Sequence, residues 1–328
     1  MENILDVRGL NVEIRTGKTP KPVLNDVCLT IGRAETVGLV GESGCGKSMT
    51  ALAIMGLLPD AARIAGGEIR YRGNELTTLR EKERCSLRGR EIAMIFQEPG
   101  RALNPLIPVG RQIAEAFLLH NPGAGKIKAR AATFEMLRSV GLSRVQSLYR
   151  EYPHRLSGGM KQRIVIAMAL MNTPGLLIAD EPTTALDVTI QYQILELIRQ
   201  MNRKFSTSML LVSHDFGVVR HVCTRIVVMY AGYVVEEGAT PDVLRTPAHP
   251  YTQGLLNSIP TSFKRGSALY SIPGTVPSLE GRSRSACPFY GRCSEGIAHC
   301  AHEMPALTAA SDGRKVRCHL RGEKRIAI

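Results

Sequence analysis

Hydrophobic and polar residues follow several different patterns along this chain. Residues 23–40 alternate apolar and polar positions and become continuously apolar at 36–40, which predicts a strand running from a sheet edge into a buried centre. Residues 49–58 have helical character and stop before Pro59. Further elements are predicted as strands at 67–71 and 92–96 and a charged helix at 79–90. The first hundred residues therefore have the pattern of a mixed α/β region.

The periodicity changes in the middle of the chain. Between Pro105 and Tyr149 apolar residues recur three and four positions apart, which predicts helices. Alternation then resumes, with predicted strands at 176–179, 208–212 and 226–230 and a helix at 190–204. After Pro247 the composition shifts to Pro, Gly, Ser and Arg. We therefore predict an α/β core of residues 1–97 and 166–246, a helical subdomain of residues 98–165 inserted into it, and a separate C-terminal element of residues 247–328.

A glycine-rich segment follows the apolar strand directly. Residues 41–48 match G-x-x-x-x-G-K-[ST] at every fixed position, between a predicted strand and a predicted helix. Glycines let the backbone point successive N–H groups inward, Lys47 can reach the β- and γ-phosphates, and Ser48 can ligate Mg²⁺ at a helix N-terminus. The alternative is a glycine-rich turn that happens to end in Lys-Ser. The predicted nucleotide-binding residues are Gly41, Ser43, Gly44, Cys45, Gly46, Lys47, Ser48 and Met49.

A later apolar strand ends in two carboxylates, Asp180 and Glu181. An acid at the carboxyl end of such a strand lies in the crevice where open α/β sheets bind ligands. Asp180 can hold Mg²⁺ through water, and Glu181 can orient or deprotonate an attacking water. Adjacent acids also occur as solvated caps, so the pair gains its weight from the phosphate loop that precedes it.

Composition narrows the remaining function classes. The 328 residues carry a formal charge of +13, but only 5% are aromatic and Trp is absent, which disfavours a reader of single-stranded nucleic acid. No apolar run approaches the roughly 18–20 residues that span a bilayer, and the first residues do not resemble a signal peptide. We expect a cytosolic, soluble protein whose membrane attachment comes through a partner. The eight cysteines are expected to be reduced in that compartment.

Six separated elements resemble, in order, the motif set of ABC-transporter ATP-binding subunits. They are residues 41–48, Gln97, residues 156–162, Asp180-Glu181, residues 185–187 and His214. The resemblance covers roughly residues 1–245. It implies an α/β fold with a RecA-like P-loop ATPase core, an antiparallel β subdomain and an inserted helical subdomain, and it implies ATP and Mg²⁺ as cofactors.

The resemblance also implies catalytic roles. Glu181 would be the catalytic base, His214 would contact the γ-phosphate, and Gln97 would contact the metal site together with Ser48 and Asp180. Two less specific interpretations stand beside these roles: Gln97 as a strand cap and His214 as a buried structural histidine.

A second group of residues implies a partner chain. Ser157, Gly158 and Gly159 resemble the signature that closes over the nucleotide of an opposite subunit, and Asp187 resembles the aspartate that crosses the dimer interface. Ser157 could instead be only a helix N-cap. On this interpretation two ATP molecules lie between two similar chains.

Two features depart from the family pattern. No aromatic residue precedes Tyr71, so adenine stacking would fall to an aliphatic or Arg side chain near Ile14 and Arg15, or to the partner, and we predict weaker or less base-selective nucleotide binding. Cys45 lies within the phosphate loop beside a lysine and a helix N-terminus, an environment that can lower the pKa of a thiol.

The last eighty residues contain four cysteines with the spacing C-x5-C-x6-C-x17-C: Cys287, Cys293, Cys300 and Cys318. The segment resembles the C-terminal extension of dipeptide and oligopeptide transporter ATPases, in Cys-Pro-Phe-x-x-Arg-Cys, in the closing Val-Arg-Cys-His, and in the preceding His249-Pro-Tyr-Thr. The resemblance implies a [4Fe–4S] cluster. Zinc also suits four cysteines, and free thiols remain a third possibility.

Together these resemblances identify the chain as a member of the dipeptide/oligopeptide and nickel importer family of ABC ATPases. They imply an ATP-hydrolysing, energy-coupling subunit at the cytoplasmic face of the inner membrane. Its partners would be a second homologous ATPase in a heterodimer, two transmembrane permeases and, indirectly, a substrate-binding protein, with no nucleic acid. Two alternatives stay open: nickel, glutathione or another peptide-like cargo, and a soluble ABC ATPase that acts on nucleic acid or ribosomes.

Overall fold

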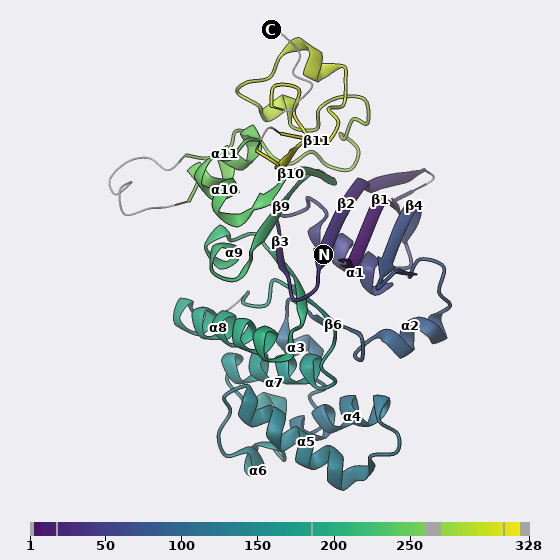
Figure 1. The fold of residues 1–328 in the computed structure, drawn as a ribbon, viewed down its shortest axis with the longest axis vertical. Coiled ribbons are helices and arrows are strands. Elements are labelled where there is room, and N and C mark those ends of the chain that lie inside the picture. The colour runs from purple at the N-terminus through teal and green to yellow at the C-terminus, as the bar shows by residue number, and fades with distance from the viewer. Residues whose placement is uncertain (1–2, 18, 185, 260–269, 311, 322–328) are drawn as a thin grey trace. The chain divides into compact units, whose positions relative to one another are not determined.

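The computed structural model describes residues 3–17, 19–184, 186–259, 270–310 and 312–321. The chain divides into two compact units, each assembled from segments that are distant in sequence (Figure 1). The first unit comprises Met1–Leu5, Ile31–Thr36 and Tyr71–Leu211, and the second comprises Asp6–Thr30, Val37–Arg70 and Val212–Ile328. None of the described helices combines the length and apolar character needed to cross a membrane.

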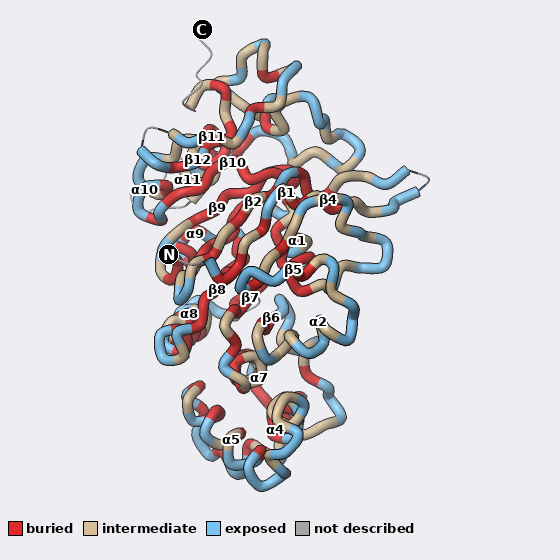
Figure 2. Tube along the Cα trace, turned by 45° about the vertical axis from the view of Figure 1, so that its right-hand side comes forward, coloured by how far each residue is buried: buried red, intermediate tan, exposed pale blue. Residues whose placement is uncertain are grey.

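The second unit contains strands of two sheets. One has the order β2 (Pro20–Gly32), β1 (Asn3–Arg15) and β4 (Ala62–Tyr71). In the other, β3 (Thr36–Val40) pairs in parallel with β9 (Arg225–Tyr230), and β9 pairs antiparallel with β10 (Tyr233–Ala239). β3 and β9 are buried and continuously apolar after their first residues, Thr36 and Arg225, as expected for strands covered on both faces, and Figure 2 shows the burial along β9.

Four helices accompany these strands in the second unit: α1 (Lys47–Met55), α9 (Phe216–Val222), α10 (Thr240–Arg245) and α11 (Pro250–Asn257). α9 packs closely on β3 at Gly38, where a Cβ would lie 2.4 Å from Cγ1 of Val219. A larger residue at position 38 would therefore push the helix off the strand that leads into the phosphate loop.

The segment after Pro247 falls within the second compact unit. β12 (Lys315–Val316) pairs antiparallel with β10 and β11 (Thr308–Ala309) pairs with β12. The carboxylate of Glu236 on β10 is fully buried and accepts hydrogen bonds from the backbone N–H groups of Ala248 and His249, at 2.8 and 2.9 Å, while Arg314 pairs with it at 3.4 Å. The sequence pattern missed this connection because two-residue strands have no readable period.

The first unit combines a parallel strand pair with most of the helices. β6 (Ile92–Ile95) pairs in parallel with β7 (Leu176–Asp180), and β8 (Ser208–Ser213) lies next to β7. The first unit also contains the short strand β5 (Asn74–Glu75) and the 3-10 turn η1 (Pro153–Arg155). Two further 3-10 turns, η3 (Tyr290–Arg292) and η4 (Ala298–Ala301), lie in the second unit.

The helices of the first unit include those predicted between Pro105 and Tyr149. The described helices of this unit are α2 (Glu81–Leu87), α3 (Pro99–Ala102), α4 (Val109–His120), α5 (Gly125–Ser139), α6 (Val145–Leu148), α7 (Gly158–Leu170) and α8 (Val188–Phe205). α4 begins against the loop after α6: Val109 donates its backbone N–H to the Glu151 carbonyl at 2.9 Å, and a Cβ at Gly110 would meet the Tyr149 ring at 2.2 Å. Close backbone contacts therefore hold the inserted helices together.

Two boundaries differ from the sequence-based prediction. Residues 23–40 form two strands rather than one, because the chain turns between Gly32 and Thr36: Ala34 has φ of 54°, and the Gly32 N–H donates to the Glu35 carboxylate at 2.6 Å. The helix expected to run to Pro59 ends earlier, at Gly56, whose left-handed conformation (φ of 63°) closes α1. In both places a local turn ends the element before the hydrophobic pattern does.

Candidate nucleotide-binding site

The phosphate loop connects β3 to α1 in the second unit and requires glycine at its fixed positions. Gly41 and Gly46 have φ of +152° and +108°. A Cβ at Gly41 would lie 2.2 Å from the Met229 carbonyl oxygen, and a Cβ at Gly46 would lie 2.6 Å from Cδ2 of Leu24. The glycines therefore serve both backbone conformation and close approach to the strands behind the loop.

α1 begins at this loop without a side-chain cap. Its N-cap residue, Gly46, offers no side chain to the first amides, so their partial positive charge is directed at whatever occupies the loop. The Lys47 side chain is buried, and Nζ donates to the carbonyl oxygens of Gly41 and Glu42 at 2.7 and 2.9 Å. An uncapped helix start together with a preplaced ammonium is the donor set that a polyphosphate needs.

Cys45 lies in the same loop and does not have the reactivity that its sequence context suggests. Its thiol is fully buried, and burial raises its pKa, outweighing the opposing effect of Lys47, whose Nζ is 3.8 Å from Sγ. The expectation of a lowered pKa is therefore wrong. Desolvation of a thiolate costs more here than a neighbouring ammonium returns.

The predicted metal ligand and base lie in the first unit. β7 ends at Asp180, which is 7% exposed, and Glu181 follows with φ of 45°. The Glu181 carboxylate accepts hydrogen bonds from Nε2 of Gln97 at 2.9 Å and from the Thr184 hydroxyl at 3.0 Å. The structure therefore brings together Gln97 and Glu181, which are 84 residues apart in sequence.

The signature residues surround the start of α7, also in the first unit. Ser157 is the N-cap, and its hydroxyl accepts from the Met160 N–H at 3.4 Å. A Cβ at Gly159 would lie 2.9 Å from Cγ2 of Ile190, so the glycine allows α7 and α8 to approach. The N-cap interpretation of Ser157 is thus confirmed as a local role, and it leaves the residue exposed.

Two further predicted residues stand at the ends of regular elements. Asp187 is the N-cap of α8 and accepts from the Ile190 N–H at 3.0 Å. His214 directly follows β8 and is exposed, which contradicts its interpretation as a buried structural histidine. The remaining loop residues Ser43, Gly44 and Ser48 are exposed, Gly158 is exposed, and Met49 is half-buried.

Residues of the C-terminal extension contact the phosphate loop, which the sequence pattern did not predict. Arg292 pairs with Glu42, the Tyr251 hydroxyl accepts from the Glu42 N–H at 2.8 Å, and Arg282 donates to the Gly44 carbonyl at 2.9 Å. The sequence feature that could have indicated this contact was the Arg of Cys-Pro-Phe-x-x-Arg-Cys. That arginine has no function if the motif serves only as a set of cysteine ligands.

The four cysteines of the extension influence one another, but they do not form a metal site as placed. Burial, followed by the neighbouring thiols, raises the pKa of Cys287 to about 11, and burial also raises the pKa values of Cys293 and Cys318. Cys287 donates its N–H to the Cys300 carbonyl at 2.9 Å. Among the described residues, no group of three or more His, Cys, Asp or Glu side chains could hold a metal ion. The iron–sulfur cluster stays a prediction.

Ile14 and Arg15, near which the group that stacks on adenine was expected, lie at the end of β1. Arg15 is exposed near the end of β1 and lines a pocket of about 470 Å³ with Glu13, Pro20 and Arg63 among others. The predictions on base stacking and selectivity are therefore unchanged.

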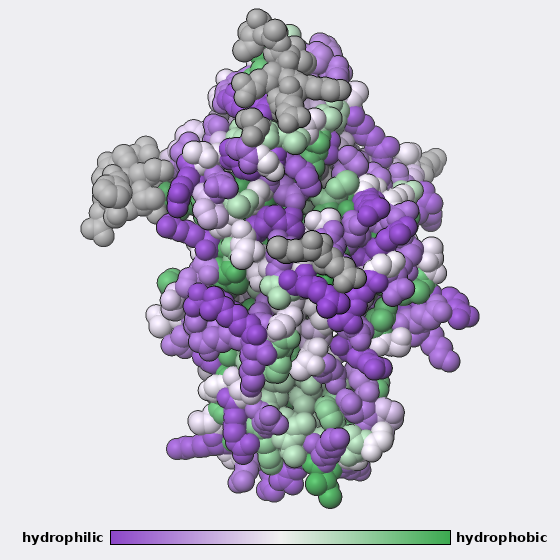
Figure 3. All heavy atoms as spheres, in the orientation of Figure 1, coloured by the Kyte–Doolittle hydropathy of each residue, from purple (hydrophilic) through white to green (hydrophobic). Residues whose placement is uncertain are grey.

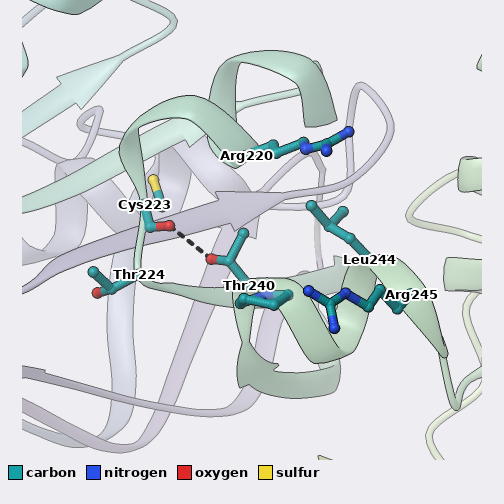
Figure 4. Close-up of a pocket in the computed structure, with 7 residues that line it drawn as sticks. Arg220, Cys223, Thr224, Thr240, Leu244 and Arg245 are labelled. Carbon is teal, nitrogen blue, oxygen red and sulfur yellow. Dashed lines mark hydrogen bonds between the residues drawn. The ribbon is translucent and has the colours of Figure 1, made fainter.

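A larger pocket in the second unit contains none of the predicted site residues. It has a volume of about 580 Å³ and lies between α9 and α10, with Arg220 on the first helix and Arg245 on the second (Figure 4). The Thr240 hydroxyl donates to the Cys223 carbonyl at 2.8 Å, and burial raises the pKa of the Cys223 thiol, which leaves no nucleophile there. The chemistry predicted from the sequence belongs to the loops and helix starts, not to this pocket.

Comparison with known proteins places these features in a family. The chain matches the ABC transporter model over residues 24–184 and the model of the oligopeptide/dipeptide transporter C-terminal region over residues 235–300. It is 45% identical to the oligopeptide transport ATP-binding protein AppD of Bacillus subtilis, over 99% of this chain and 98% of that one. It is 44% identical to OppD of Salmonella typhimurium over 96% and 93% of the two chains, and 42% identical to the dipeptide transport protein DppD of Escherichia coli over 96% of each.

Solved structures agree on the fold. The dimeric ATP-binding cassette MJ0796, bound to ADP and Pi, aligns with a TM-score of 0.65 and 27% identity over 72% of this chain and 98% of that chain. CbiO1 from Clostridium perfringens, part of the CbiONQ transporter, aligns with a TM-score of 0.62 and 25% identity over 75% and 97%. The predicted α/β fold with a P-loop ATPase core is confirmed.

Proposed function

The chain belongs to the ATP-binding subunits of ABC transporters for oligopeptides and dipeptides, and from this premise we propose that it hydrolyses ATP to drive peptide import. Full-length similarity to AppD, OppD and DppD favours peptides over nickel or glutathione as the cargo. The structural observation that carries the proposal is the uncapped start of α1 beside buried Lys47. An uncapped helix start and a buried ammonium in a glycine-rich loop together suit the phosphates of a nucleotide.

The phosphate loop would bind ATP through backbone groups. The first amides of α1 would donate to phosphate oxygens, and Lys47 would exchange its bonds to the carbonyls of Gly41 and Glu42 for bonds to phosphate. Because glycine at positions 41 and 46 already sets the loop conformation, little conformational entropy would be lost when ATP binds. ATP would therefore bind a loop that is largely formed in advance.

Mg²⁺ would be held by Ser48 and Asp180, with Gln97 as a further ligand, all oxygen donors of the kind this ion prefers. When bound, it would neutralise charge on the phosphates during transfer. The position of Asp180 at the carboxyl end of β7 supports this role, because open α/β sheets bind ligands at the carboxyl ends of their strands.

Glu181 would act as the base that orients or deprotonates the attacking water. Gln97 and Thr184 both donate to its carboxylate, which fixes its orientation. Gln97 would sense whether the carboxylate is engaged, and His214 would contact the γ-phosphate. The hydrolytic residues would thus act from loops that follow strands.

Glu181→Gln tests this assignment. The amide retains hydrogen bonding but cannot accept a proton, so ATP hydrolysis should fall by about 10²–10⁴-fold while ATP binding persists. The variant should therefore accumulate as an ATP-bound dimer with its counterpart chain, measured by light scattering. Glu98→Gln, an exposed neighbour that pairs with Arg101, is the matched control. Normal hydrolysis by Glu181→Gln would remove Glu181 from this role.

A second ATPase chain would complete each site. Ser157, Gly158 and Gly159 are accessible at the start of α7, and Asp187 is exposed at the start of α8, so all four can meet a partner's nucleotide. The dimeric form of MJ0796 supports such an arrangement. We propose a heterodimer, and mixing the chain with its counterpart in ATP and Mg²⁺ should produce a complex that neither chain forms alone.

Two transmembrane permeases would be the other direct partners, with a substrate-binding protein acting through them. The helical elements α4 and α5 carry strongly exposed apolar residues, Leu106 before α4, Leu119 and Ile127, and the face over these elements shows apolar side chains among polar ones (Figure 3). Such a surface suits a protein partner. The chain would then lie peripherally at the cytoplasmic face of the cell membrane, and it should co-purify with membrane proteins rather than with nucleic acid or ribosomes.

We further propose that Cys287, Cys293, Cys300 and Cys318 hold an iron–sulfur cluster. Their spacing and the hydrogen bond from the Cys287 N–H to the Cys300 carbonyl at 2.9 Å support a common site. Anaerobically purified protein should contain about four iron atoms per chain and absorb visible light. Cys318→Ser should lose both properties, whereas Cys85→Ser, which changes an exposed thiol outside the extension, should keep them. Stoichiometric zinc without iron would contradict the cluster.

A further inference from the structure

An arginine of the C-terminal extension forms a two-point ion pair with the phosphate loop. Nη1 and Nη2 of Arg292 lie 2.7 and 3.0 Å from the two carboxylate oxygens of Glu42, the second residue of the loop. The Arg292 side chain is 7% exposed and that of Glu42 is 30% exposed. Paired N–H donors facing both oxygens are the strong, directional form of an arginine–carboxylate contact.

Arg292 is itself held rigidly. Its Nε donates to the Pro273 carbonyl at 2.8 Å, and its guanidinium lies 5.7 Å from the centre of the Tyr230 ring. Tyr230, Tyr251 and Phe289 are buried and pack against one another, with ring centroids 4.6 to 5.4 Å apart. A side chain fixed by packing can impose its position on a loop, whereas a mobile surface arginine cannot.

Two more contacts fix the same loop. The Tyr251 hydroxyl accepts the Glu42 N–H at 2.8 Å. Arg282 bridges the Gly44 carbonyl, at 2.9 Å, and the Val23 carbonyl, at 3.3 Å. The extension and α11 thus hold residues of the loop that lie between its fixed glycines.

The ion pair also has an electrostatic consequence. Glu42 places a negative charge inside a loop whose amides and lysine suit anions, and an unpaired carboxylate there would repel phosphate. Arg292 is the cation that offsets this charge, and its partial burial protects the pair from screening by salt.

We infer that Arg292 is a positioning residue of the nucleotide site: it neutralises Glu42, holds the phosphate loop in its binding conformation, and thereby makes ATP affinity depend on the C-terminal extension. The inference rests on the proposed function, because it requires that this loop binds ATP. It assigns the extension a role in nucleotide binding that does not depend on whether its cysteines hold a metal.

The test measures ATP affinity of the full-length chain by calorimetric titration, with thermal melting recorded for every variant. Arg292→Ala should weaken ATP binding about tenfold, because it leaves the Glu42 charge uncompensated. Arg292→Lys, which keeps the charge but loses the two-point geometry, should weaken it about threefold. Arg284→Ala is the matched control: this arginine belongs to the same extension, is exposed, and pairs with Glu13 at 3.4 Å.

The decisive variant is the double substitution Arg292→Ala with Glu42→Gln. Removing the carboxylate should restore ATP affinity to within about threefold of the wild type, because the repulsion disappears with it. A role limited to fold stability predicts no such rescue, since both substitutions break the same ion pair. A double variant as weak as Arg292→Ala, or an Arg292→Ala variant with unchanged ATP affinity, would overturn the inference.

The remaining outcomes of the experiment also test the inference. If Arg292→Ala does not fold, Arg292→Gln, which also removes the positive charge, and its combination with Glu42→Gln provide the same comparison. Wild-type protein that folds but does not bind ATP would refute the proposed function itself, whereas wild-type binding that is insensitive to Arg292 would refute only this inference.

Discussion

Two helix starts that we propose to contact nucleotide are built in opposite ways. α1 in the second unit begins at Gly46 with no side-chain cap, whereas α7 in the first unit begins at Ser157, whose hydroxyl caps the Met160 N–H. The first leaves its amides to a ligand and takes its support from elsewhere in the chain. The second satisfies one of its own amides and presents a hydroxyl that can also meet a partner's nucleotide.

The two helix starts are also held in place by different parts of the chain. Residues of α11 and the extension, over two hundred positions away in sequence, hold the phosphate loop through Tyr251, Arg282 and Arg292. The start of α7 lies close to neighbouring α8, where a Cβ at Gly159 would lie 2.9 Å from Cγ2 of Ile190. The loop proposed to bind phosphate is thus held by tertiary contacts, while the proposed signature at the start of α7 is formed locally.

The largest difference in ATP affinity should appear when a methyl group is added to a glycine of the phosphate loop and to a glycine at the start of α7. Gly41→Ala places a Cβ 2.2 Å from the Met229 carbonyl oxygen at a φ of +152°, so the backbone must move and ATP affinity should fall about 100-fold, close to 3 kcal/mol. Gly159→Ala places a Cβ 2.9 Å from Cγ2 of Ile190, so α7 or α8 must shift slightly, but neither helix belongs to the phosphate loop, and ATP affinity of the isolated chain should stay within about twofold.

Gly73→Ala separates backbone strain from the steric clash in this experiment. Its φ of +80° imposes similar strain, but an added Cβ has no atom within 4 Å. Titration of ATP into the three variants gives the comparison. Equal losses of ATP affinity in Gly41→Ala and Gly73→Ala would show that the close approach to β9 does not matter.

Acidification should weaken the support of the phosphate loop and spare the signature. His249 caps α11 by accepting the Tyr251 N–H at 3.0 Å, and burial lowers its pKa to about 3. The unfolded chain, with an ordinary His pKa near 6.5, binds the proton more readily, so stability present above about pH 6.5 is lost as pH falls towards 3. At pH 5 the loss from this residue should be about 2 kcal/mol relative to pH 8.

Chemical denaturation at the two pH values measures this loss. His249→Asn keeps a side-chain acceptor but cannot titrate, so its pH dependence should be smaller by that amount. His154→Asn replaces an exposed histidine close to the signature and should retain the wild-type dependence. Identical pH dependence in wild type and His249→Asn would show that the buried ring does not control stability in this range.

The smallest change in stability should come from substitution of Ser157, the N-cap of α7. Ser157→Ala removes the hydroxyl acceptor and should cost about 1 kcal/mol of stability, while Ser157→Gly should cost only a few tenths, because glycine is tolerated at an N-cap. Both should lower ATP hydrolysis in the two-chain assembly, since both lack the hydroxyl. Stability from denaturation and hydrolysis by the assembly, measured on both variants, therefore separate the two roles; hydrolysis that follows only stability would leave Ser157 as a cap alone.

Much of the fold followed from local patterns that physical chemistry makes readable. The continuous apolar runs of β3, β7 and β9 and the three-to-four spacing of α4 and α5 were predictable because burial on both faces or on one stripe leaves a period in the sequence. The turn at residues 32–36 and the two-residue strands β11 and β12 were not predictable, because single polar contacts and tertiary pairing determine them.

The sequence by itself determined the identity and order of the residues that we propose to bind nucleotide, since a phosphate loop needs particular residue types at fixed spacing. Tertiary structure alone decided that Gln97 donates to Glu181, that the Cys45 thiol is buried rather than activated, and that Arg292 pairs with Glu42. Spacing encodes contacts within one loop, because neighbouring residues share a backbone. Contacts across 84 or 250 positions depend on how strands and helices pack, and desolvation depends on everything that surrounds a side chain.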